Sequence, residues 1–171
     1  MRGLFFVSFI GPLHLIMYLQ KILPFLLLVI SFSLSANNKI ICEDLNLSSL
    51  PSDISITKNV FIQNRIGLPD FCQITGLIEP SIHFEARFPV SNWNGNYFQA
   101  GCGGFCGLVL PERETHSNSI NHALRMGYAS ITTDSGHSGD HIGDASWALD
   151  NPLAEQVYAR DILPVTHTVG H

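Results

Sequence analysis

A cluster of glycines directly after an aromatic segment limits the folds that this chain can adopt. Four glycines, at positions 101, 103, 104 and 107, follow the aromatic and polar run Trp93–Gln99. Because glycine has no Cβ, such a loop can turn at positive φ and bring backbone N–H groups close to a ligand. The cluster is therefore an oxyanion hole, a phosphate-binding loop or a tight turn, and the rest of the chain must distinguish these.

Phosphate binding requires a spacing that this loop lacks. A P-loop ends in Lys and Ser or Thr, and a dinucleotide loop opens directly into a helix. The run Gly101–Gly107 contains no lysine, and Leu108–Pro111 follows it in place of a helix start. An oxyanion loop fits better, since α/β hydrolases take one oxyanion N–H from a glycine-rich loop after an early strand. From spacing alone, a plain turn remains the alternative.

The segments around the loop predict strands and helices in alternation. Strict alternation of apolar and polar residues predicts a half-buried strand over 82–88, and Asn94-Gly95 predicts a hairpin turn into a second strand over 97–100. Residues 120–126 predict a helix capped by Ser117 or Asn118 and ended by Gly127, followed by a strand over 128–133. A second helix is expected over 153–163, stopped or kinked by Pro164. Strands with a helix between them indicate an α/β fold with function at the carboxyl ends of the strands.

Residues 1–35 are expected to be an export signal and not part of the fold. Lys21 precedes the apolar run Ile22–Phe32, and small residues at Ser33 and Ser35 place cleavage before Ala36. An uncleaved membrane anchor is the alternative, but the run is shorter than the roughly 20 residues that span a bilayer. Met17 is interpreted as the true start of the protein.

Without the signal the chain is acidic. Removing Arg2 and Lys21 from the 9 basic residues leaves 7 against 14 acidic residues, a net charge of 7 − 14 = −7. This balance leaves no basic patch and argues against nucleic acid as a partner. Four cysteines in an exported chain suggest disulfides, although four cysteines allow three pairings and the sequence alone does not choose. A secreted or periplasmic location is expected, with no membrane association after cleavage.

Two further patterns lie in the polar segment 134–144. The run from Gly136 to Asp140 nearly matches the nucleophile elbow G-x-S-x-G around Ser138, but Asp140 replaces the last glycine and no helical pattern follows. Asp134, His137, Asp140, His141 and Asp144 lie within eleven residues of one another. They match neither a calcium loop nor H-E-x-x-H, so solvated loop side chains are favoured over a metal site. Neither Ser138 as nucleophile nor a metal in this chain is predicted.

Taken in order, several motifs resemble the tannase and feruloyl esterase family, a branch of secreted α/β hydrolases. The resemblance runs from about Ile41 to the end of the chain. It is carried by 68–76 (LPDFCQITG), 82–89 (IHFEARFP), 93–99 (WNGNYFQ), 101–107 (GCGGFCG), 127–129 (GYA), 133–139 (TDSGHSG) and 145–152 (ASWALDNP). Any one of these motifs is weak, and together in this order they are specific.

The resemblance implies a serine esterase that hydrolyses small aromatic acid esters through an acyl-enzyme. Gly103 or Gly104 then corresponds to the first oxyanion donor of the family, and Cys42 and Cys72 to its N-terminal disulfide. The pairing of Cys102 with Cys106 stays open. The segment Thr133–Gly139 corresponds to a loop at a strand end that does not carry the nucleophile.

The chain departs from the family pattern in one respect. The family serine lies in a Cys-Ser-x-Gly-Gly elbow, and these 171 residues contain no such sequence. The catalytic triad is expected beyond His171, as are the lid and the family calcium site, so no cofactor is expected in this chain.

The chain is thus expected to be the N-terminal part of an α/β-hydrolase fold, truncated before its catalytic residues. The expected organisation is a signal over 1–35, an N-terminal extension over 36–80 and the first part of the hydrolase domain over 81–171. The alternative function is a non-catalytic exported binding module that uses the polar Asp/His loop.

Overall fold

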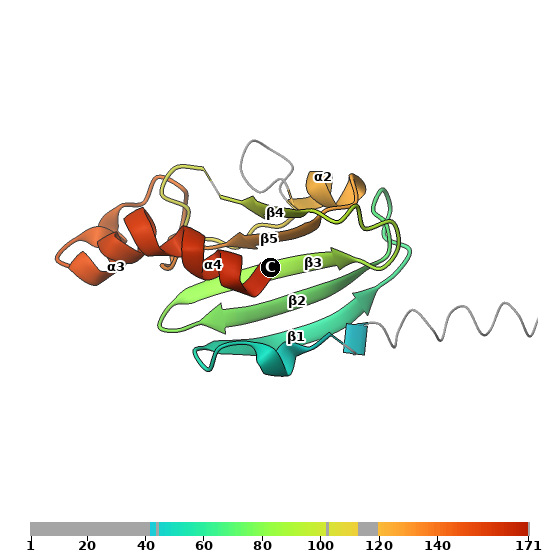
Figure 1. Ribbon diagram of the computed structural model, residues 1–171. Coiled ribbons are helices and arrows are strands. Elements are labelled where there is room, and N and C mark those ends of the chain that lie inside the picture. Colours follow the sequence, from blue (N-terminus) through green and yellow to red (C-terminus); the bar gives the residue numbers. More distant parts are fainter. Residues whose placement is uncertain (1–41, 44, 102, 113–119, 171) are drawn as a thin grey trace, which may run out of the picture. The chain divides into compact units, whose positions relative to one another are not determined.

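The computed structural model describes residues 42–43, 45–101, 103–112 and 120–170. All of them belong to one unit, Lys39–His171. The described residues form a five-stranded mixed sheet with helices (Figure 1). The fold is therefore of the predicted α/β class.

The predicted strands are present, but the strand over 82–88 is not half-buried as its alternation predicted, because its charged residues Glu85 and Arg87 are buried as well. β1 (Ile54–Ile62), β2 (Phe71–Ile78) and β3 (Ile82–Pro89) form an antiparallel meander. β4 (Tyr97–Ala100) and β5 (Ala129–Thr133) complete the sheet in the order β1-β2-β3-β5-β4. The segment interpreted as an extension thus supplies two strands that are continuous with β3.

The predicted hairpin between the strands at 82–88 and 97–100 is wrong. β3 pairs antiparallel with β5, and within the described ranges β4 pairs only with β5, in parallel. Asn94 makes a tight turn, its side-chain oxygen accepting from the N–H of Asn96 at 2.8 Å, but the turn docks onto the end of a helix. The N–H of Asn94 donates to the carbonyl of Gly127 at 2.9 Å. The turn at Asn94 and the strand over 97–100 are confirmed, whereas the pairing of that strand with the strand over 82–88 is wrong.

Helix α2 (Ile120–Arg125) connects β4 to β5 in the manner of a parallel crossover. It ends at Gly127, which has φ +83°. The N–H of Gly127 donates to Leu124 and that of Tyr128 to Ala123, both at 3.0 Å, so the helix ends in a Schellman motif as its glycine predicts. The predicted capping residues Ser117 and Asn118 lie outside the described residues.

The C-terminal helical segment continues past the proline that was expected to stop or kink it. It comprises α3 (Pro152–Gln156), a π turn η3 (Val157–Asp161) and α4 (Ile162–Gly170), with Pro164 inside α4. Proline lacks the N–H that would bond to the carbonyl of Arg160, and its ring crowds that carbonyl. The wide turn immediately before Pro164 contains Arg160 and accommodates this mismatch.

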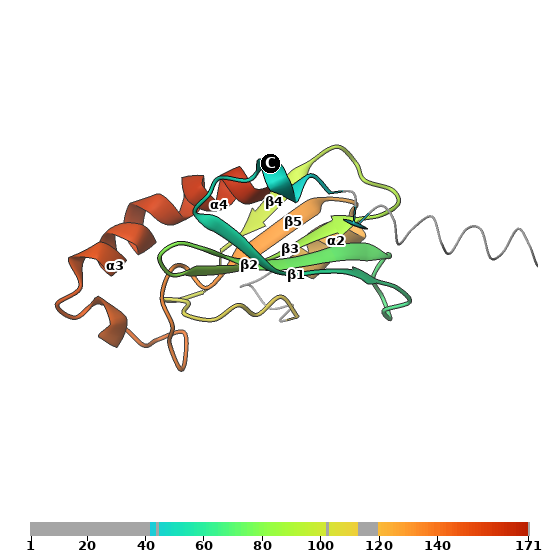
Figure 2. The same cartoon turned by 90° about the horizontal axis from the view of Figure 1, so that it is seen from below.

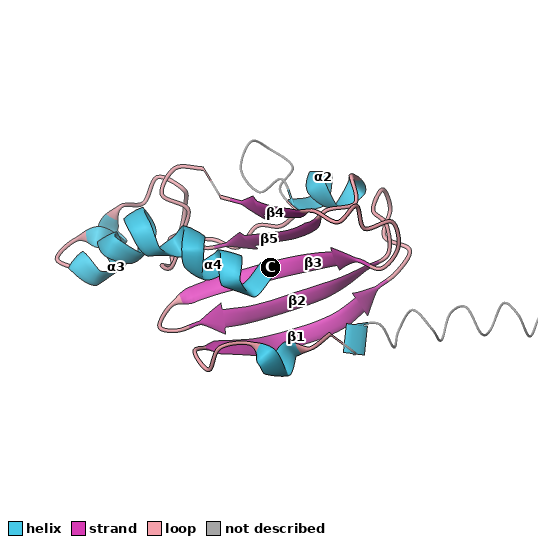
Figure 3. Cartoon of the chain, viewed as in Figure 1, coloured by secondary structure: helices cyan, strands magenta, loops and turns pink. Residues whose placement is uncertain are grey.

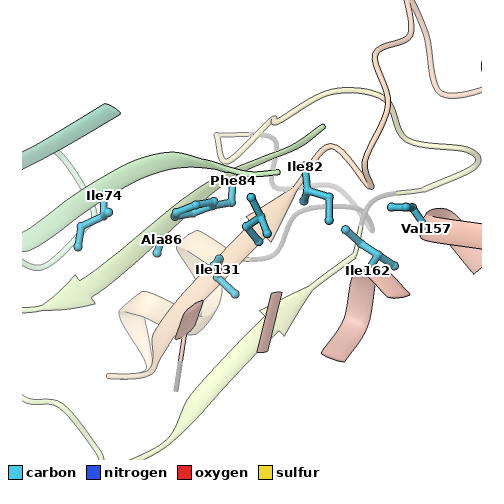
Figure 4. Packing of buried hydrophobic residues seen from close by; sticks show 8 residues of the cluster. Ile74, Ile82, Phe84, Ala86, Ile131, Val157 and Ile162 are labelled. Atoms are coloured by element: carbon cyan, nitrogen blue, oxygen red, sulfur yellow. The ribbon is translucent and has the colours of Figure 1, made fainter. Parts of the chain in front are cut away.

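The apolar core lies between the sheet and the C-terminal helical segment. Val157 and Ile162 pack on side chains of one sheet face (Figure 4), which come from Ile74, Ile78, Ile82, Phe84, Ala86 and Ile131. Helix α4 runs along this face of the sheet (Figure 2). Glu85 and Arg87, which alternate along β3 with these core residues, point to the opposite face of the sheet. There the guanidinium of Arg87 donates to the carboxylate of Glu85 and to the side-chain oxygen of Asn121 in α2.

Two short 3-10 helices, η1 (Leu47–Ser49) and η2 (Ser146–Ala148), complete the described elements. A disulfide joins Cys42 to Cys72 and attaches the segment before η1 to β2, as the family resemblance implied. Across the described ranges, no helix has the length and apolar character needed to cross a membrane.

Candidate active site

Two loops meet where the parallel strands β4 and β5 end. The glycine loop, Gly101–Gly107, follows β4, and the polar loop, Asp134–Gly143, follows β5 (Figure 3). The N–H of Gly107 donates to the carbonyl of Asp134, and the N–H of Gly139 donates to the carbonyl of Gly107, both at 3.0 Å. The predicted location of function, at the carboxyl ends of the strands, is therefore where these loops come together.

Among the described residues of the glycine loop, two adjacent N–H groups have no hydrogen-bond partner. Phe105 donates to the carbonyl of Ile142 at 2.7 Å and Cys106 to that of Gly103 at 3.2 Å. By contrast, the N–H groups of Gly103 and Gly104 donate to no group among the described residues. Gly103 is half-buried and Gly104 is exposed, so these two adjacent donors are accessible to a ligand.

The conformation of Gly104 requires glycine. Its φ is +60°, and a Cβ at this position would collide with the carbonyl oxygen of Ile142. A side chain there would therefore push the glycine loop away from the polar loop. The requirement explains the glycine at 104 without any appeal to a ligand, so it does not by itself distinguish an oxyanion loop from a tight turn.

Asp134 connects the two loops to β3. One carboxylate oxygen accepts from the N–H of His83 at 3.1 Å and of Gly136 at 2.9 Å, and the other lies 2.8 Å from the Nδ1 atom of His83. The Asp134 side chain is only 5 % exposed, whereas that of His83 is 58 % exposed. Burial raises the pKa of Asp134, against the opposing effect of its hydrogen bonds with Gly136 and His83.

His137 is buried in contact with aromatic rings. Its ring stacks on Trp147 with centroids 3.8 Å apart and an angle of 14° between the planes. Burial lowers the pKa of His137, because the surrounding rings disfavour the charged imidazolium. Burial therefore favours the neutral form of the ring.

The polar loop does not gather its side chains around a common point. Asp134 is bonded to His83, and His137 is stacked on Trp147. The carboxylate of Asp144 accepts from the N–H of Ser146 at 2.9 Å. Within the described ranges, no group of three or more His, Cys, Asp or Glu side chains is placed to hold a metal ion.

A buried ionic network holds the chain that leaves the glycine loop. Arg87 is fully buried and bonds to Glu85, Glu112 and Asn121, with its guanidinium carbon 5.0 Å from the ring centre of Phe71. Desolvation opposes ionisation of Glu112, but hydrogen bonds from Arg87 and Asn121 and the charges of Arg87 and Arg65 together lower its pKa. The network attaches the segment at Glu112 to β3 and α2.

Ser138 lies in a setting unlike that of a nucleophile. It is exposed, and the chain after it forms bends and turns until the short helix η2. A nucleophile elbow needs a strand that runs directly into a helix. Of the loop cysteines, Cys106 is bonded in a disulfide, and Cys102 lies outside the described residues.

Two cavities flank the sheet at its opposite ends. One of about 310 Å³ lies beside the polar loop and is lined by Ser81, His137, Ser138 and Trp147 among others. A larger one, about 770 Å³, is lined by Phe88, Trp93, Tyr97 and His167 among others, close to where β4 and β5 begin. The larger cavity is at the wrong end of the parallel strands for chemistry at the glycine loop.

Several contributors to this region were not predicted from the sequence. They are His83, Trp147 and Tyr158. The partners of His83 and Tyr158 lie 51 and 54 residues away in the chain, whereas Trp147 stacks on the nearby His137. For these three residues, the sequence offered one usable indication. His83 occupies a polar position in an alternating strand, which predicts that its side chain is exposed but does not identify its partner.

Comparisons with known proteins agree with this architecture. The chain is 42% identical over 89 residues to an uncharacterized esterase of Xanthomonas campestris pv. campestris, which covers 50% of this chain and 14% of the relative. It is 30% identical over 141 residues to an uncharacterized esterase of Agrobacterium fabrum, covering 71% of this chain and 25% of the relative. The chain thus spans a quarter or less of the length of these relatives.

Solved structures share the fold at low sequence identity. Feruloyl esterase B from Aspergillus oryzae superposes with a TM-score of 0.61 at 21% identity, over 78% of this chain and 28% of that one. Another esterase from Aspergillus oryzae gives a TM-score of 0.57 at 16% identity, over 75% and 28%. The five-stranded sheet and its helices therefore match part of a larger esterase fold.

A family model described as tannase and feruloyl esterase matches residues 67–171. This range contains β2 to β5, the glycine loop, the polar loop and the C-terminal helical segment. Together with the esterase relatives, the match means that the chain belongs to the tannase and feruloyl esterase family.

Proposed function

We propose that this chain is the N-terminal part of an exported carboxylic-ester hydrolase, in which Gly103 and Gly104 supply the first oxyanion donors. The observation that carries the proposal is the pair of free N–H groups at the carboxyl end of β4. Backbone donors held rigidly at such a position stabilise the negative oxygen that develops during ester hydrolysis. The substrate class is a small ester of an aromatic acid, as the printed names of the family and of a structural relative suggest.

The reaction would proceed through an acyl-enzyme formed on a serine outside these 171 residues. Histidine would take the serine proton as the oxygen attacks the ester carbonyl, and the oxyanion would be held by backbone donors. Each step after attack, including hydrolysis of the acyl-enzyme by water, requires groups that this chain does not contain. We therefore expect the 171-residue chain alone to be inactive.

The course of α4 is compatible with a further strand next to β4. The side chain of Gln99 donates to the carbonyl of Leu163 at 3.2 Å, and the ring of Tyr97 lies 5.4 Å from that of His167. Helix α4 thus runs antiparallel to β4 and returns the chain to the end where β4 begins. A following strand could pair in parallel with the free edge of β4 and end beside the glycine loop.

Export and calcium belong to the same proposal. The disulfide between Cys42 and Cys72 suits an oxidising compartment, as does the signal inferred over 1–35. A calcium site would lie in the lid and not in the described residues, which offer no suitable cluster of oxygen ligands.

The test compares two products of the gene on hydroxycinnamate and gallate esters. One is the 171-residue chain, and the other is the longest product encoded when the DNA beyond codon 171 is included. We expect a Cys-Ser-x-Gly-Gly elbow in the added sequence, ester hydrolysis by the longer product and none by the 171-residue chain. Rapid turnover by the shorter chain, abolished by Ser138→Ala, would contradict the proposal and identify Ser138 as the nucleophile.

A titration of the 171-residue chain with calcium and zinc separates the proposal from a non-catalytic binding module. The geometry of Asp134 and His137, each engaged elsewhere, leads us to expect no tight stoichiometric binding. Tight binding that is lost in Asp140→Asn or His141→Gln would favour the binding module.

A further inference from the structure

Four aromatic rings from separate segments surround the glycine loop. They are Phe105 of the glycine loop, His137 of the polar loop, Trp147 of η2 and Tyr158 of η3. Tyr158 lies 5.1 Å from Trp147, 5.7 Å from His137 and 6.3 Å from Phe105, measured between ring centres. We call these four residues the ring cluster. Edge and tilted contacts of this kind add to the stability given by burial alone.

Tyr158 contributes a polar contact as well as its ring. Its hydroxyl donates to the carbonyl oxygen of Gly104 at 2.9 Å. On the other side of the same peptide unit, the N–H of Phe105 donates to the carbonyl of Ile142 at 2.7 Å. The peptide between Gly104 and Phe105 is thus held at both its oxygen and its nitrogen.

Fixing this peptide also fixes the free donors before it. Gly104 has φ +60°, and glycine gives the chain freedom to rotate there unless something else restrains it. Because the peptide after Gly104 is anchored on both sides, the backbone at Gly103 and Gly104 has less freedom to change conformation. The hydroxyl of Tyr158 supplies one of these two anchors.

Helical geometry brings Tyr158 to this position. It is the second residue of the π turn Val157–Asp161, whose extra residue changes the direction in which the following side chains point. Val157, just before it, is buried against the sheet and anchors the turn. Tyr158 is therefore presented to the glycine loop from a rigid element.

We infer that Tyr158 is a positioning residue for the oxyanion-binding loop, acting through its hydrogen bond to the carbonyl of Gly104. The inference rests on the proposed function of Gly103 and Gly104. Tyr158 does not contact the reacting atoms and belongs to no recognisable motif. Its hydroxyl sets the direction of the N–H groups of Gly103 and Gly104. The ring cluster holds the Tyr158 ring so that the hydroxyl cannot swing away.

The experiment uses the 171-residue chain labelled with nitrogen-15 and the variant Tyr158→Phe, which removes one oxygen and keeps the ring. Phenylphosphonate, a tetrahedral anion, serves as the probe of the oxyanion site. We expect it to shift the amide signals of Gly103 and Gly104 in the unmodified chain. Because one hydrogen bond is worth about 1 kcal/mol, which is roughly fivefold in an equilibrium, Tyr158→Phe should weaken probe binding about fivefold. The amide of Phe105 should also exchange about fivefold faster with solvent.

Tyr128→Phe provides the matched control, because the Tyr128 ring packs on Phe98 away from the ring cluster. Amides of α2 and β3 should keep their signals in both variants and so report an intact fold. If the probe shifts Gly103 and Gly104 equally well in Tyr158→Phe, the inference about Tyr158 is overturned and the proposed function stands. If the probe leaves these two signals unchanged in the unmodified chain, the proposed function fails and the inference fails with it.

Discussion

At the scale of single residues, His137 couples the stability of the protein to pH. Burial lowers its pKa, whereas the nearby charges of Asp134 and Asp144 act in the opposite direction. In the unfolded chain a histidine takes up its proton near its ordinary pKa of about 6.5. The unfolded state therefore binds more protons just below that pH, and the folded state is favoured less.

We accordingly expect the free energy of unfolding to fall as the pH is lowered from about 6.5 towards the lower pKa of folded His137. Urea unfolding at pH 7.5 and pH 5.0 measures the effect. His137→Phe retains a ring that stacks on Trp147 but cannot take up a proton, so it should reduce the difference between the two pH values. An equal difference in the variant would show that other groups cause it.

Residue types alone could not reveal these pairings. Asp134 and His137 were visible in the sequence as members of a polar loop, and the loop was correctly expected to follow a strand. That Asp134 accepts from His83 depends on β3 lying beside β5, which no local pattern encodes. The glycines at 103 and 104 were visible from spacing, whereas Tyr158 required the course of the chain over more than fifty residues.

At the scale of elements, the buried face between β3 and α2 depends on Arg87. Replacing it with Met would leave Glu85, itself buried, without its charge partner. Breaking a buried ion pair from one side costs about 3–5 kcal/mol, so Arg87→Met should lower the free energy of unfolding by about that amount. The matched control is Arg65→Met, whose partially exposed pair with Glu112 is worth about 1 kcal/mol or less. Equal effects in urea unfolding would contradict the role given to Arg87.

Pro164 and the π turn form a second case at this scale. Pro164→Ala restores an N–H that can bond to the carbonyl of Arg160, which removes the reason for the wide turn. We expect the segment to relax towards a regular α-helix and Tyr158 to lose its bond with Gly104. Faster solvent exchange of the Phe105 amide in this variant is the measurement. Unchanged exchange would mean that the π turn has another cause.

Local patterns predicted where elements lie better than how they associate or end. The strand over 82–88 was predicted from its alternation, the strand over 97–100 from the turn before it, and the strand over 128–133 from its β-prone residues. The hairpin at Asn94-Gly95 was wrong because a turn signal specifies a reversal and not the partner strand. Of the two alternatives at Pro164, a stop or a kink, the stop is wrong, because the π turn before the proline accommodates the missing hydrogen bond.

At the scale of the whole molecule, β4 is an edge strand of the sheet that the described residues form. β4 pairs with β5 on one side only, and unpaired strand edges recruit other strands. We expect the 171-residue chain to self-associate with rising concentration, as measured by light scattering after size-exclusion chromatography. Gln99→Lys places a charge on this edge and should reduce the association.

Thr168→Lys is the control, since it adds the same charge on α4 and not on the strand edge. If both substitutions reduce the association equally, the effect comes from net charge and not from the edge of β4.

Of the molecule as a whole, the sequence predicted the fold class and the family, because both depend on the order of motifs. The strand order could not be predicted, because no local pattern indicates that β5 lies between β3 and β4.

The position of β5 between β3 and β4 has a consequence for the order of folding. The meander of β1, β2 and β3 is built from neighbouring segments and can form early. β5, which is distant from β3 in the sequence, must then pair with β3. Until β5 is in place, β4 has no strand of the sheet to pair with. The glycine loop follows β4, so its geometry is established late, and a ribosome must have released β5 before the loop can take shape. Amides of the loop should accordingly be the last of the sheet region to gain protection during refolding.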